Sequence, residues 1–290
     1  MISNTTSYIP TQLVYLNYPR LKNEPMLSGN IMSTGAAFGF DHTSTLLRGI
    51  YEIVERDAFM TVYLCRIPAL RINVALLNDT KIQFIYKTYN RYNLETYLFE
   101  ITNDLKIPSF LTVLVDRNHE PHLTLGLKSS FNKKEAIIGS MEEAFLSRPW
   151  QRKMIMDNTF NTNKKPESMS TLFERAVLWR PYNMLKKLNF LLLKKPKNYT
   201  LQTQKINDDE ALEKIKIILS RCGYQLIYTD ITYEKLKQTG GVVYKVFIPD
   251  LQPLYLKEEY KEINLMRLKT VSNYFGIKKI TINTFPHPFL

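Results

Sequence analysis

The sequence is poor in cysteine and histidine, the side chains that build disulfide frameworks and zinc sites. Its 290 residues include 2 cysteines and 4 histidines. Cys65 and Cys222 are far apart in apolar, helix-like contexts, so we expect two free core thiols rather than a disulfide, as in a reducing cytoplasm. The closest histidine pair, His119-x-x-His122, encloses Pro121. That proline favours a turn, and the four histidines make no zinc pattern.

Long hydrophobic runs and the standard nucleotide-binding loops are also missing. The longest aliphatic cluster, residues 190–193, is far too short to span a bilayer. The first residues have neither the basic start nor the apolar run of a secretory signal. No G-x-G-x-x-G follows a strand pattern, and there is no Walker A motif or internal repeat. We therefore expect a cytoplasmic protein without a membrane-spanning segment.

Positive charge is in excess, but only in one half of the chain. The net charge is +12; residues 1–144 hold 14 basic and 14 acidic side chains, and residues 145–290 hold 25 and 13. The lysines of the second half come as scattered pairs, with no zinc-finger or RNA-binding motif around them, which argues against nucleic acid as a partner. Solvated surface is the simpler interpretation, and attraction to an acidic peptide or partner protein is the alternative.

Helix and strand patterns alternate along the chain, and this predicts an α/β or α+β fold with a mixed or largely antiparallel sheet and flanking helices. The polar stretch 157–170 separates a first part, 1–156, from a basic part, 171–290. Helices are expected at 43–65, 79–91, 132–148, 208–222 and 233–237. Strands are expected at 8–16, 32–40, 97–101, 110–115, 122–127, 225–229 and 242–248.

The most informative of these helices carries two carboxylates on one stripe. Glu52 and Glu55 are spaced i, i+3, so their side chains can converge. Two convergent carboxylates suit Mg²⁺ bound to nucleotide phosphates, with water and phosphate oxygens completing the octahedron. The alternative is an ordinary surface stripe on which Arg48 pairs with Glu52. A second acidic helix, residues 142–148, is equally unspecific by itself.

Two motifs together carry a resemblance to a known family. Ser33-Thr-Gly-Ala-Ala-Phe-Gly39, followed by Gly49-Ile-Tyr-Glu-Ile-Val-Glu-Arg-Asp-Ala58, resembles the central motif of the YcaO family. More narrowly, the chain resembles the thiazole/oxazole-forming peptide maturases of the streptolysin-associated type. Further matching segments follow in the family order: Tyr8-Ile-Pro, Glu24-Pro25, 104–108, 143–148, Asp230-Ile-Thr232, 252–256, Arg267-Leu268 and the terminal Phe285-Pro-His-Pro-Phe-Leu290.

The resemblance implies an ATP-dependent cyclodehydratase that acts on a ribosomally made precursor peptide, as in bacteriocin biosynthesis. In that family a Cys, Ser or Thr side chain attacks the preceding carbonyl, ATP phosphorylates the amide oxygen, and loss of phosphate leaves an azoline ring. ATP and Mg²⁺ are the implied cofactors. The precursor peptide and an E1-like, leader-binding protein are the implied partners.

The resemblance also assigns residues. It implies a single YcaO-like domain over 1–290 in which Glu52 and Glu55 hold magnesium. Pro286 and Pro288 would belong to a tail that orders the active site, since the fixed φ of proline lets a tail insert with little entropy loss. The implied ATP-binding residues are Ser33, Glu52, Arg56, Glu143 and Arg148.

The chain also departs from the family pattern. Ser44 replaces a usual carboxylate, Phe40 a usual polar residue and Leu146 a common glutamine. The family also has a substantial portion before the Tyr-Ile-Pro segment, with further magnesium ligands, so we expect an N-terminally truncated form; a separately encoded N-terminal half is one expected partner. Two hypotheses follow: part of an ATP-dependent maturase, or an inactive scaffold that binds a precursor peptide or partner protein. Both predict no detectable ATPase for the isolated chain.

Overall fold

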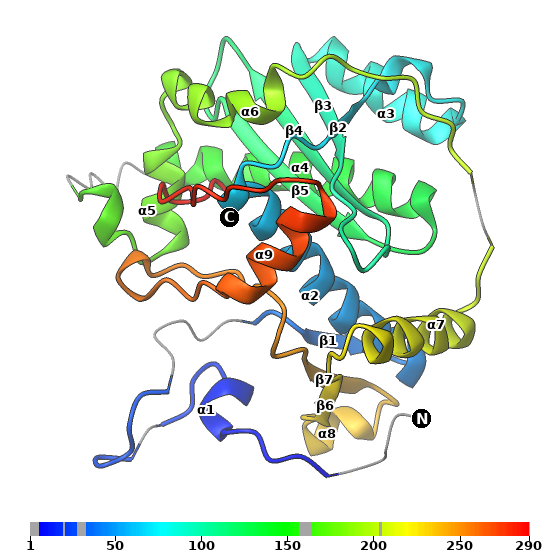
Figure 1. The fold of residues 1–290 in the computed structure, drawn as a ribbon, viewed down its shortest axis with the longest axis vertical. Coiled ribbons are helices and arrows are strands. Elements are labelled where there is room, and N and C mark those ends of the chain that lie inside the picture. The colour runs from blue at the N-terminus through cyan, green and yellow to red at the C-terminus, as the bar shows by residue number, and fades with distance from the viewer. Residues whose placement is uncertain (1–5, 20, 28–32, 157–163, 203–204, 290) are drawn as a thin grey trace.

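The computed structural model describes residues 6–19, 21–27, 33–156, 164–202 and 205–289 (Figure 1). Its larger sheet has the order β2-β3-β4-β5, and each neighbouring pair is antiparallel. These strands are β2 (Leu70–Ile72), β3 (Leu94–Glu100), β4 (Ser109–Asp116) and β5 (Leu123–Ser129). Every residue of β4 is buried, because this strand has a neighbour on each side and helices over both faces.

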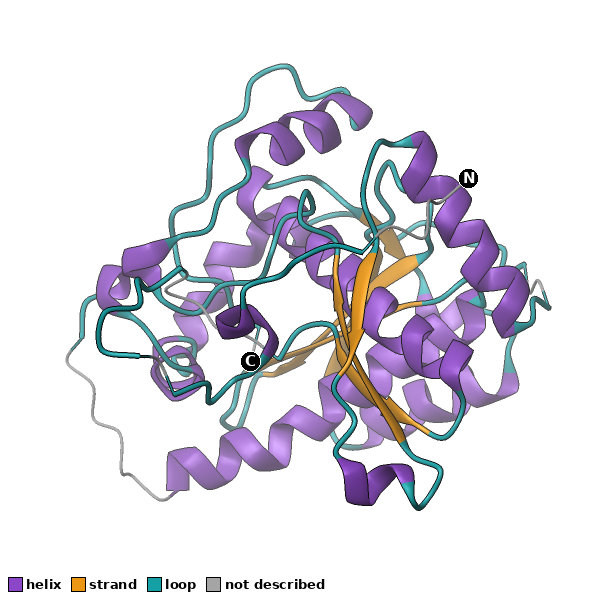
Figure 2. Cartoon of the chain, turned by 90° about the horizontal axis from the view of Figure 1, so that it is seen from below, coloured by secondary structure: helices purple, strands orange, loops and turns teal. Residues whose placement is uncertain are grey.

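Two apolar layers sandwich this sheet. On one face, α3 (Thr80–Arg91) and α4 (Lys133–Met156) cover a cluster that includes Leu98, Phe110 and Leu114. On the other face, the second half of α2 (His42–Cys65) packs on Phe99, Leu111 and Val113. Figure 2 shows the strands enclosed by helices on both sides.

A second, smaller sheet lies beside the first half of α2. Its order is β1-β7-β6, again antiparallel throughout, with β1 (Ala36–Gly39), β7 (Val242–Phe247) and β6 (Ile227–Asp230). Leu47, Ile50 and Val54 of α2 pack against Val246 of β7 and against α7 (Asp208–Arg221). The expected α+β class is confirmed, and of the two expected sheet types the antiparallel one is present, as two separate sheets with α2 between them.

The remaining elements connect and cover these layers. The short helices are α5 (Leu172–Leu178), α6 (Asn189–Leu192), α8 (Glu234–Lys237) and α9 (Leu265–Tyr274), with 3₁₀ turns at Val74–Leu76, Pro166–Ser168, Tyr182–Leu188 and Glu258–Tyr260. The C-terminal segment crosses the molecule and ends beside α2 (Figure 1). No helix in the described part of the chain is long and apolar enough to cross a membrane.

The strand expected at 8–16 is wrong. The segment forms one helical turn, α1 (Thr11–Val14), directly after Pro10. Proline fits the start of a helix, and the buried Gln12 side chain donates to Glu24 Oε1 at 2.7 Å and to the Pro25 carbonyl at 2.8 Å. These bonds join the turn to residues 24–25 of the same segment, whereas no sheet partner adjoins it in the described ranges.

The helix expected to end at Arg148 continues to Met156, with Pro149 inside it. A proline removes one helical hydrogen bond, so it usually ends a helix. Here the turn beyond the proline is held by tertiary contacts: Gln151 is buried, and the Trp150 ring lies 5.7 Å from that of Phe173 in the α5 helix.

The two cysteines are free, as expected, but only Cys65 belongs to the core; Cys222 is exposed after the end of α7. The stretch expected to be a polar loop lies partly outside the described residues, and its described remainder includes the 3₁₀ turn Pro166–Ser168.

Candidate active site

The site is built on α2, which forms where the sequence predicts it. Asp41 caps the helix, its Oδ2 accepting a hydrogen bond from the Ser44 N–H at 2.8 Å. The apolar stripe of the helix is buried between the two sheets. Because the helix is fixed along this stripe, the polar stripe beside it has a fixed direction.

Glu52 faces the segment that leads into β1. Its Oε2 accepts a hydrogen bond from the Gly35 N–H at 3.0 Å, and its Oε1 lies 3.4 Å from Arg56 Nη2. Gly35 has φ +82°, and a Cβ atom there would lie 2.3 Å from the Val246 carbonyl oxygen. Only glycine therefore allows the backbone to approach β7 and present this N–H to Glu52.

Glu55 faces the other sheet. Its Oε2 accepts a hydrogen bond from the Ser129 N–H, at the end of β5, at 3.0 Å. The side chain is buried, and burial raises the pKa of Glu55 to about 8; the Lys128 charge opposes this effect and Glu143 adds to it. The group is therefore mainly neutral at pH 7 when no cation is bound.

Glu143 comes to the same edge of the sheet from α4. The Leu127 N–H, two residues before that of Ser129, donates to Glu143 Oε2. The close approach of α4 depends on Gly126, where a Cβ atom would lie 2.1 Å from the Ser140 carbonyl oxygen. Burial raises the pKa of Glu143, and Arg56 and Lys128 oppose this shift.

The C-terminal tail reaches the same site. Phe289 is 2% exposed, and the Arg56 guanidinium carbon lies 4.2 Å from the centre of its ring, a cation–π contact. The Pro286 carbonyl accepts hydrogen bonds from Tyr63 Oη and Trp179 Nε1, each at 3.1 Å. The inserted, buried tail is thus one wall of the site.

The buried side chains of Arg175 and of the tail residue His287 fix the tail to the rest of the chain. Arg175, which is fully buried, donates to the carbonyl of His287 at 3.1 Å and pairs with Glu258. His287 donates from Nε2 to the Tyr255 carbonyl at 2.7 Å, and burial lowers the pKa of His287 well below its ordinary value. The histidine is neutral and takes part in packing, so it adds no charge to the site.

The structure brings together most of the predicted residues, but not Arg148. Its guanidinium donates to Asp116 Oδ2 at 2.8 Å and to the Pro121 carbonyl at 3.0 Å. Pro121 lies just before the start of β5, whereas Glu143 bonds Leu127 near the end of that strand. Six extended residues separate these points by about 20 Å, so Arg148 does not share the pocket of Glu143 as expected.

Ser33 is exposed and lines a groove of about 610 Å³ together with Ala36 and Lys245. Sequence reasoning missed Lys245, whose Nζ donates to the Thr34 carbonyl at 2.7 Å. Burial lowers the pKa of Lys245, and the Glu52 charge opposes that effect. A lysine inside the apolar strand pattern 242–248 is the signal that could have found it. Lys128 was missed because it directly follows residues 122–127, an apolar stretch that predicts an ordinary strand.

The donor set fits Mg²⁺ only when an anionic ligand accompanies it. In the ranges that the structure describes, no three His, Cys, Asp or Glu side chains form a group that could hold a metal ion. The three carboxylates nevertheless interact: the charges of Glu143 and Glu52 both raise the pKa of Glu55. A divalent cation would relieve this repulsion, and phosphate oxygens would complete its coordination.

An α+β scaffold that brings the carboxyl groups of Glu52, Glu55 and Glu143 close to the positive charges of Arg56, Lys128 and Lys245 suits a metal complexed with a polyanion. The chain belongs to the YcaO cyclodehydratase family, described as ATP- and Mg²⁺-binding, which it matches over residues 1–252. The family expected from the central motif is thereby confirmed, as are ATP and Mg²⁺ as its ligands.

One curated protein and several solved structures are similar to this chain. A *Rhizobium leguminosarum* bv. *trifolii* protein, described as an uncharacterized protein in the tfuA 3′ region, is 30% identical over 121 residues, which are 41% of this chain and 28% of that protein. A heterocyclase solved with substrate and cofactor superposes with a TM-score of 0.77 at 20% identity, covering 97% of this chain and 36% of its own.

Two further structures share the fold. The *E. coli* microcin synthetase McbBCD complex with pro-MccB17 bound gives a TM-score of 0.57 at 15% identity, over 83% of this chain and 62% of that one. YcaO from *Methanopyrus kandleri*, bound with AMPPCP and Mg²⁺, gives 0.59 at 15% identity, over 84% and 60%. The chain thus spans less than two thirds of the length of each of these proteins.

Proposed function

We propose that this chain is the nucleotide-binding part of an ATP-dependent cyclodehydratase that converts Cys, Ser or Thr residues of a ribosomally made precursor peptide into azolines, in the biosynthesis of bacteriocin-like, azole-modified peptides. The observation that carries the proposal is the set of three interacting carboxyl groups, the buried one of Glu55 and the half-buried ones of Glu52 and Glu143, beside Arg56 in a chain of this family.

The chemistry explains why such a site is needed. A backbone amide oxygen is a poor leaving group, and bound ATP–Mg²⁺ supplies the phosphoryl group that turns it into phosphate. Glu52, fixed by the Gly35 N–H, and Glu55, fixed by the Ser129 N–H, would hold the magnesium. Arg56, oriented by the Phe289 ring, would place positive charge on the phosphates.

The remaining roles are also part of the proposal. Ser33 lies on the rim of the groove beside Lys245, where it can reach the nucleotide. Pro286 and Pro288 are buried in the tail that brings Phe289 to Arg56. The precursor peptide is the proposed substrate, and an E1-like, leader-binding protein is the proposed partner. The microcin synthetase complex with its bound peptide supports this kind of assembly.

Nucleotide binding and ring formation test the proposal separately. We expect a fluorescent ATP analogue to bind only with Mg²⁺, and Glu52→Gln to weaken that binding. The matched control is Glu142→Gln, because Glu142 is an exposed neighbour of Glu143 that pairs with Lys81. Mass spectrometry of the co-encoded precursor peptide, incubated with the chain and its partners, should show the loss of one water per ring.

A second candidate function rests on a specific observation. Phe40 and Leu146, which replace usual polar residues, are 72% and 71% exposed, and neither side chain can donate or accept a hydrogen bond to a bound nucleotide. An inactive scaffold would bind the precursor peptide but neither bind ATP–Mg²⁺ nor form rings. We expect no ATPase from the isolated chain under either function. Robust magnesium-dependent hydrolysis that disappears in Glu52→Ala would overturn that expectation.

A further inference from the structure

β6 is the edge strand of the small sheet, with no neighbouring strand on its outer side in the part of the chain that the structure describes. The register pairs Thr229 with Lys245 and Tyr228 with Val246. The Val246 N–H points to β1, where it donates to the Gly35 carbonyl at 2.8 Å. Peptide groups alternate in direction along a strand, so Thr229 bonds towards β7 and Tyr228 turns its N–H and C=O outward. Within the described ranges, no backbone hydrogen bond is made to that outer side of β6.

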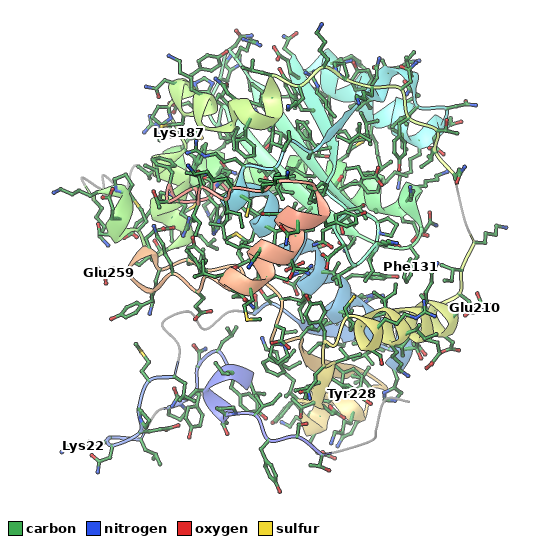
Figure 3. The ribbon with its side chains drawn as sticks, in the orientation of Figure 1. Lys22, Phe131, Lys187, Glu210, Tyr228 and Glu259 are labelled. Carbon is green, nitrogen blue, oxygen red and sulfur yellow. The ribbon has the colours of Figure 1, made fainter. Side chains whose placement is uncertain are left out.

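Natural edge strands are commonly blunted by charges or prolines. β6 contains no proline and one charge, that of its last residue Asp230, whose Oδ1 accepts a hydrogen bond from the Thr232 N–H at 2.8 Å. Residues 225–229 before it read Gln-Leu-Ile-Tyr-Thr. The outward peptide groups of Tyr228 are a template to which another extended chain can add. Tyr228, labelled in Figure 3, is 54% exposed on this strand.

A groove runs along this edge. Its volume is about 880 Å³, and it is formed between residues 6–15 of the N-terminal segment, the end of α7 and residues 224–229. Figure 1 shows the N-terminal segment beside the small sheet. Among the residues that line the groove, Lys216 alone is charged, and it pairs with Glu213 at 2.6 Å. With tyrosine and aliphatic walls and no carboxylate, the groove suits an uncharged or acidic extended peptide.

The groove is continuous with the approach to the active site. Thr11, Val14 and Tyr15 line both this groove and the 610 Å³ groove that ends at Ser33 and Lys245. The register also places Thr229, Lys245 and Ala36 in one row across the small sheet. The row leads from the free edge to the Thr34–Gly35 peptide, whose N–H bonds Glu52.

We propose that the outer edge of β6 binds an extended segment of the precursor peptide by strand addition, and that the peptide continues beneath the N-terminal segment to the carboxylate cluster. The identity of this peptide rests on the proposed function. A strand added outside β6 lies three strand spacings from β1, about 14 Å. The bound segment and the modified residue are therefore at least about four extended residues apart.

The test separates the peptide backbone contact from the side chain. Tyr228→Pro removes the outward N–H without removing a bond to β7, a position at which edge strands accept proline. Tyr228→Thr is the matched control, since it removes the ring and keeps the N–H. The probe is a fluorescein-labelled octapeptide of alternating valine and threonine with one central aspartate, read by fluorescence anisotropy.

We expect wild type and Tyr228→Thr to bind this probe within about threefold of each other. Tyr228→Pro should bind it at least about tenfold more weakly, because a backbone hydrogen bond is lost and its partner is left unpaired. The same probe N-methylated at alternate residues should not bind. Equal binding by Tyr228→Pro and Tyr228→Thr, or no binding of the probe by wild type, overturns the proposal.

Hydrogen exchange of the wild-type chain gives a measurement that does not depend on the folding of a variant. The probe should slow exchange of the amides of residues 227–230, and unchanged exchange there overturns the proposal. Sedimentation velocity tests whether a second copy of the chain occupies the edge instead. A wild-type dimer that Tyr228→Pro converts to a monomer would show that it does, and this result also overturns the proposal.

The outcome is separable from that of the proposed function. Tyr228→Pro should bind the fluorescent ATP analogue with Mg²⁺ as wild type does, since Tyr228 is not among the carboxylate-site residues. If the chain binds the probe on β6 but binds no nucleotide, this edge is still a peptide site, and the proposed cyclodehydratase function is refuted. Ring formation that Tyr228→Pro leaves unchanged would refute only the edge.

Discussion

The ionisation of Glu55 leads to a strong prediction about stability, because its carboxyl group is buried between α2 and β5. Glu55→Gln keeps the shape of the side chain and an oxygen that can accept from the Ser129 N–H, but it cannot ionise. The difference between wild type and this variant therefore isolates the titration of one group from that of Glu143 and the surface carboxylates.

The direction and size follow from the pKa of Glu55, which burial raises from an ordinary 4.5 to about 8. The unfolded chain loses this proton near pH 4.5, whereas the folded chain keeps it up to about pH 8. The contribution of Glu55 to stability is therefore complete below pH 4.5 and is lost as the pH rises to 8. Over the whole interval the contribution of Glu55 to the free energy of unfolding falls by about 5 kcal/mol, of which about 3 kcal/mol is lost by pH 7.

Urea unfolding, followed by tryptophan fluorescence and circular dichroism at pH 5 and pH 8, measures this loss. Wild type should lose about 3 to 4 kcal/mol relative to Glu55→Gln between the two pH values. Glu142→Gln, which changes an exposed carboxylate paired with Lys81, should follow wild type at both. If Glu55→Gln also loses stability in parallel with wild type, Glu55 is not held neutral and the reasoning fails.

Calorimetry extends this prediction to the proposed metal. A carboxyl group that is mainly protonated at pH 7 must lose its proton to become a magnesium ligand. Binding of ATP–Mg²⁺ should therefore release close to one proton in wild type, seen by comparing buffers of different ionisation enthalpy, and clearly less in Glu55→Gln. Equal proton release by both proteins would show that Glu55 does not ligate the metal.

Three other substitutions test the surroundings of the site. Glu52→Gln should weaken binding of the ATP analogue with Mg²⁺ at least about tenfold, the lower end for groups that support a metal site, with little change in urea stability. Phe289→Ala should cost about 3 to 5 kcal/mol of unfolding free energy and also weaken nucleotide binding, because Arg56 loses the ring it lies on; Phe289→Leu should recover most of the stability. Arg267→Met should lower the free energy of unfolding by about 3 to 5 kcal/mol, because the buried Asp57 carboxylate, which Arg267 contacts at 2.7 Å, loses its counter-charge. Adding Asp57→Asn to it should restore part of that loss, and a purely additive double variant would argue against a direct pair.

Local patterns in the sequence predicted the carboxylate helix well. An Asp41 cap, an apolar stripe and the i, i+3 spacing of Glu52 and Glu55 all lie within one element, so helical periodicity alone fixes them. Three strands of the larger sheet, β3, β4 and β5, were predicted from local apolar patterns, whereas the short edge strand β2 (Leu70–Ile72) was not. Ser33, Glu143 and the tail prolines were assigned only through the family motif, since nothing local distinguishes them.

Some local rules were overridden by contacts between distant segments. Pro149 did not end its helix, because Trp150 and Gln151 pack beyond it. The alternating pattern near Pro10 did not form a strand, since its hydrogen bonds are made within its own segment. Arg148 was assigned to the nucleotide pocket by its motif, but it is paired with Asp116.

The sequence lacks cysteine clusters, histidine clusters and the standard nucleotide loops. By itself it determined the carboxylate helix and its charge. Only the tertiary structure decided what surrounds that helix. Glu143 arrives from α4 because Gly126 admits it, Gly35 brings an N–H to Glu52, and the tail brings Phe289 to Arg56. These contacts join residues that are distant along the chain. They depend on the shapes of packed surfaces, which no periodicity within a single segment encodes.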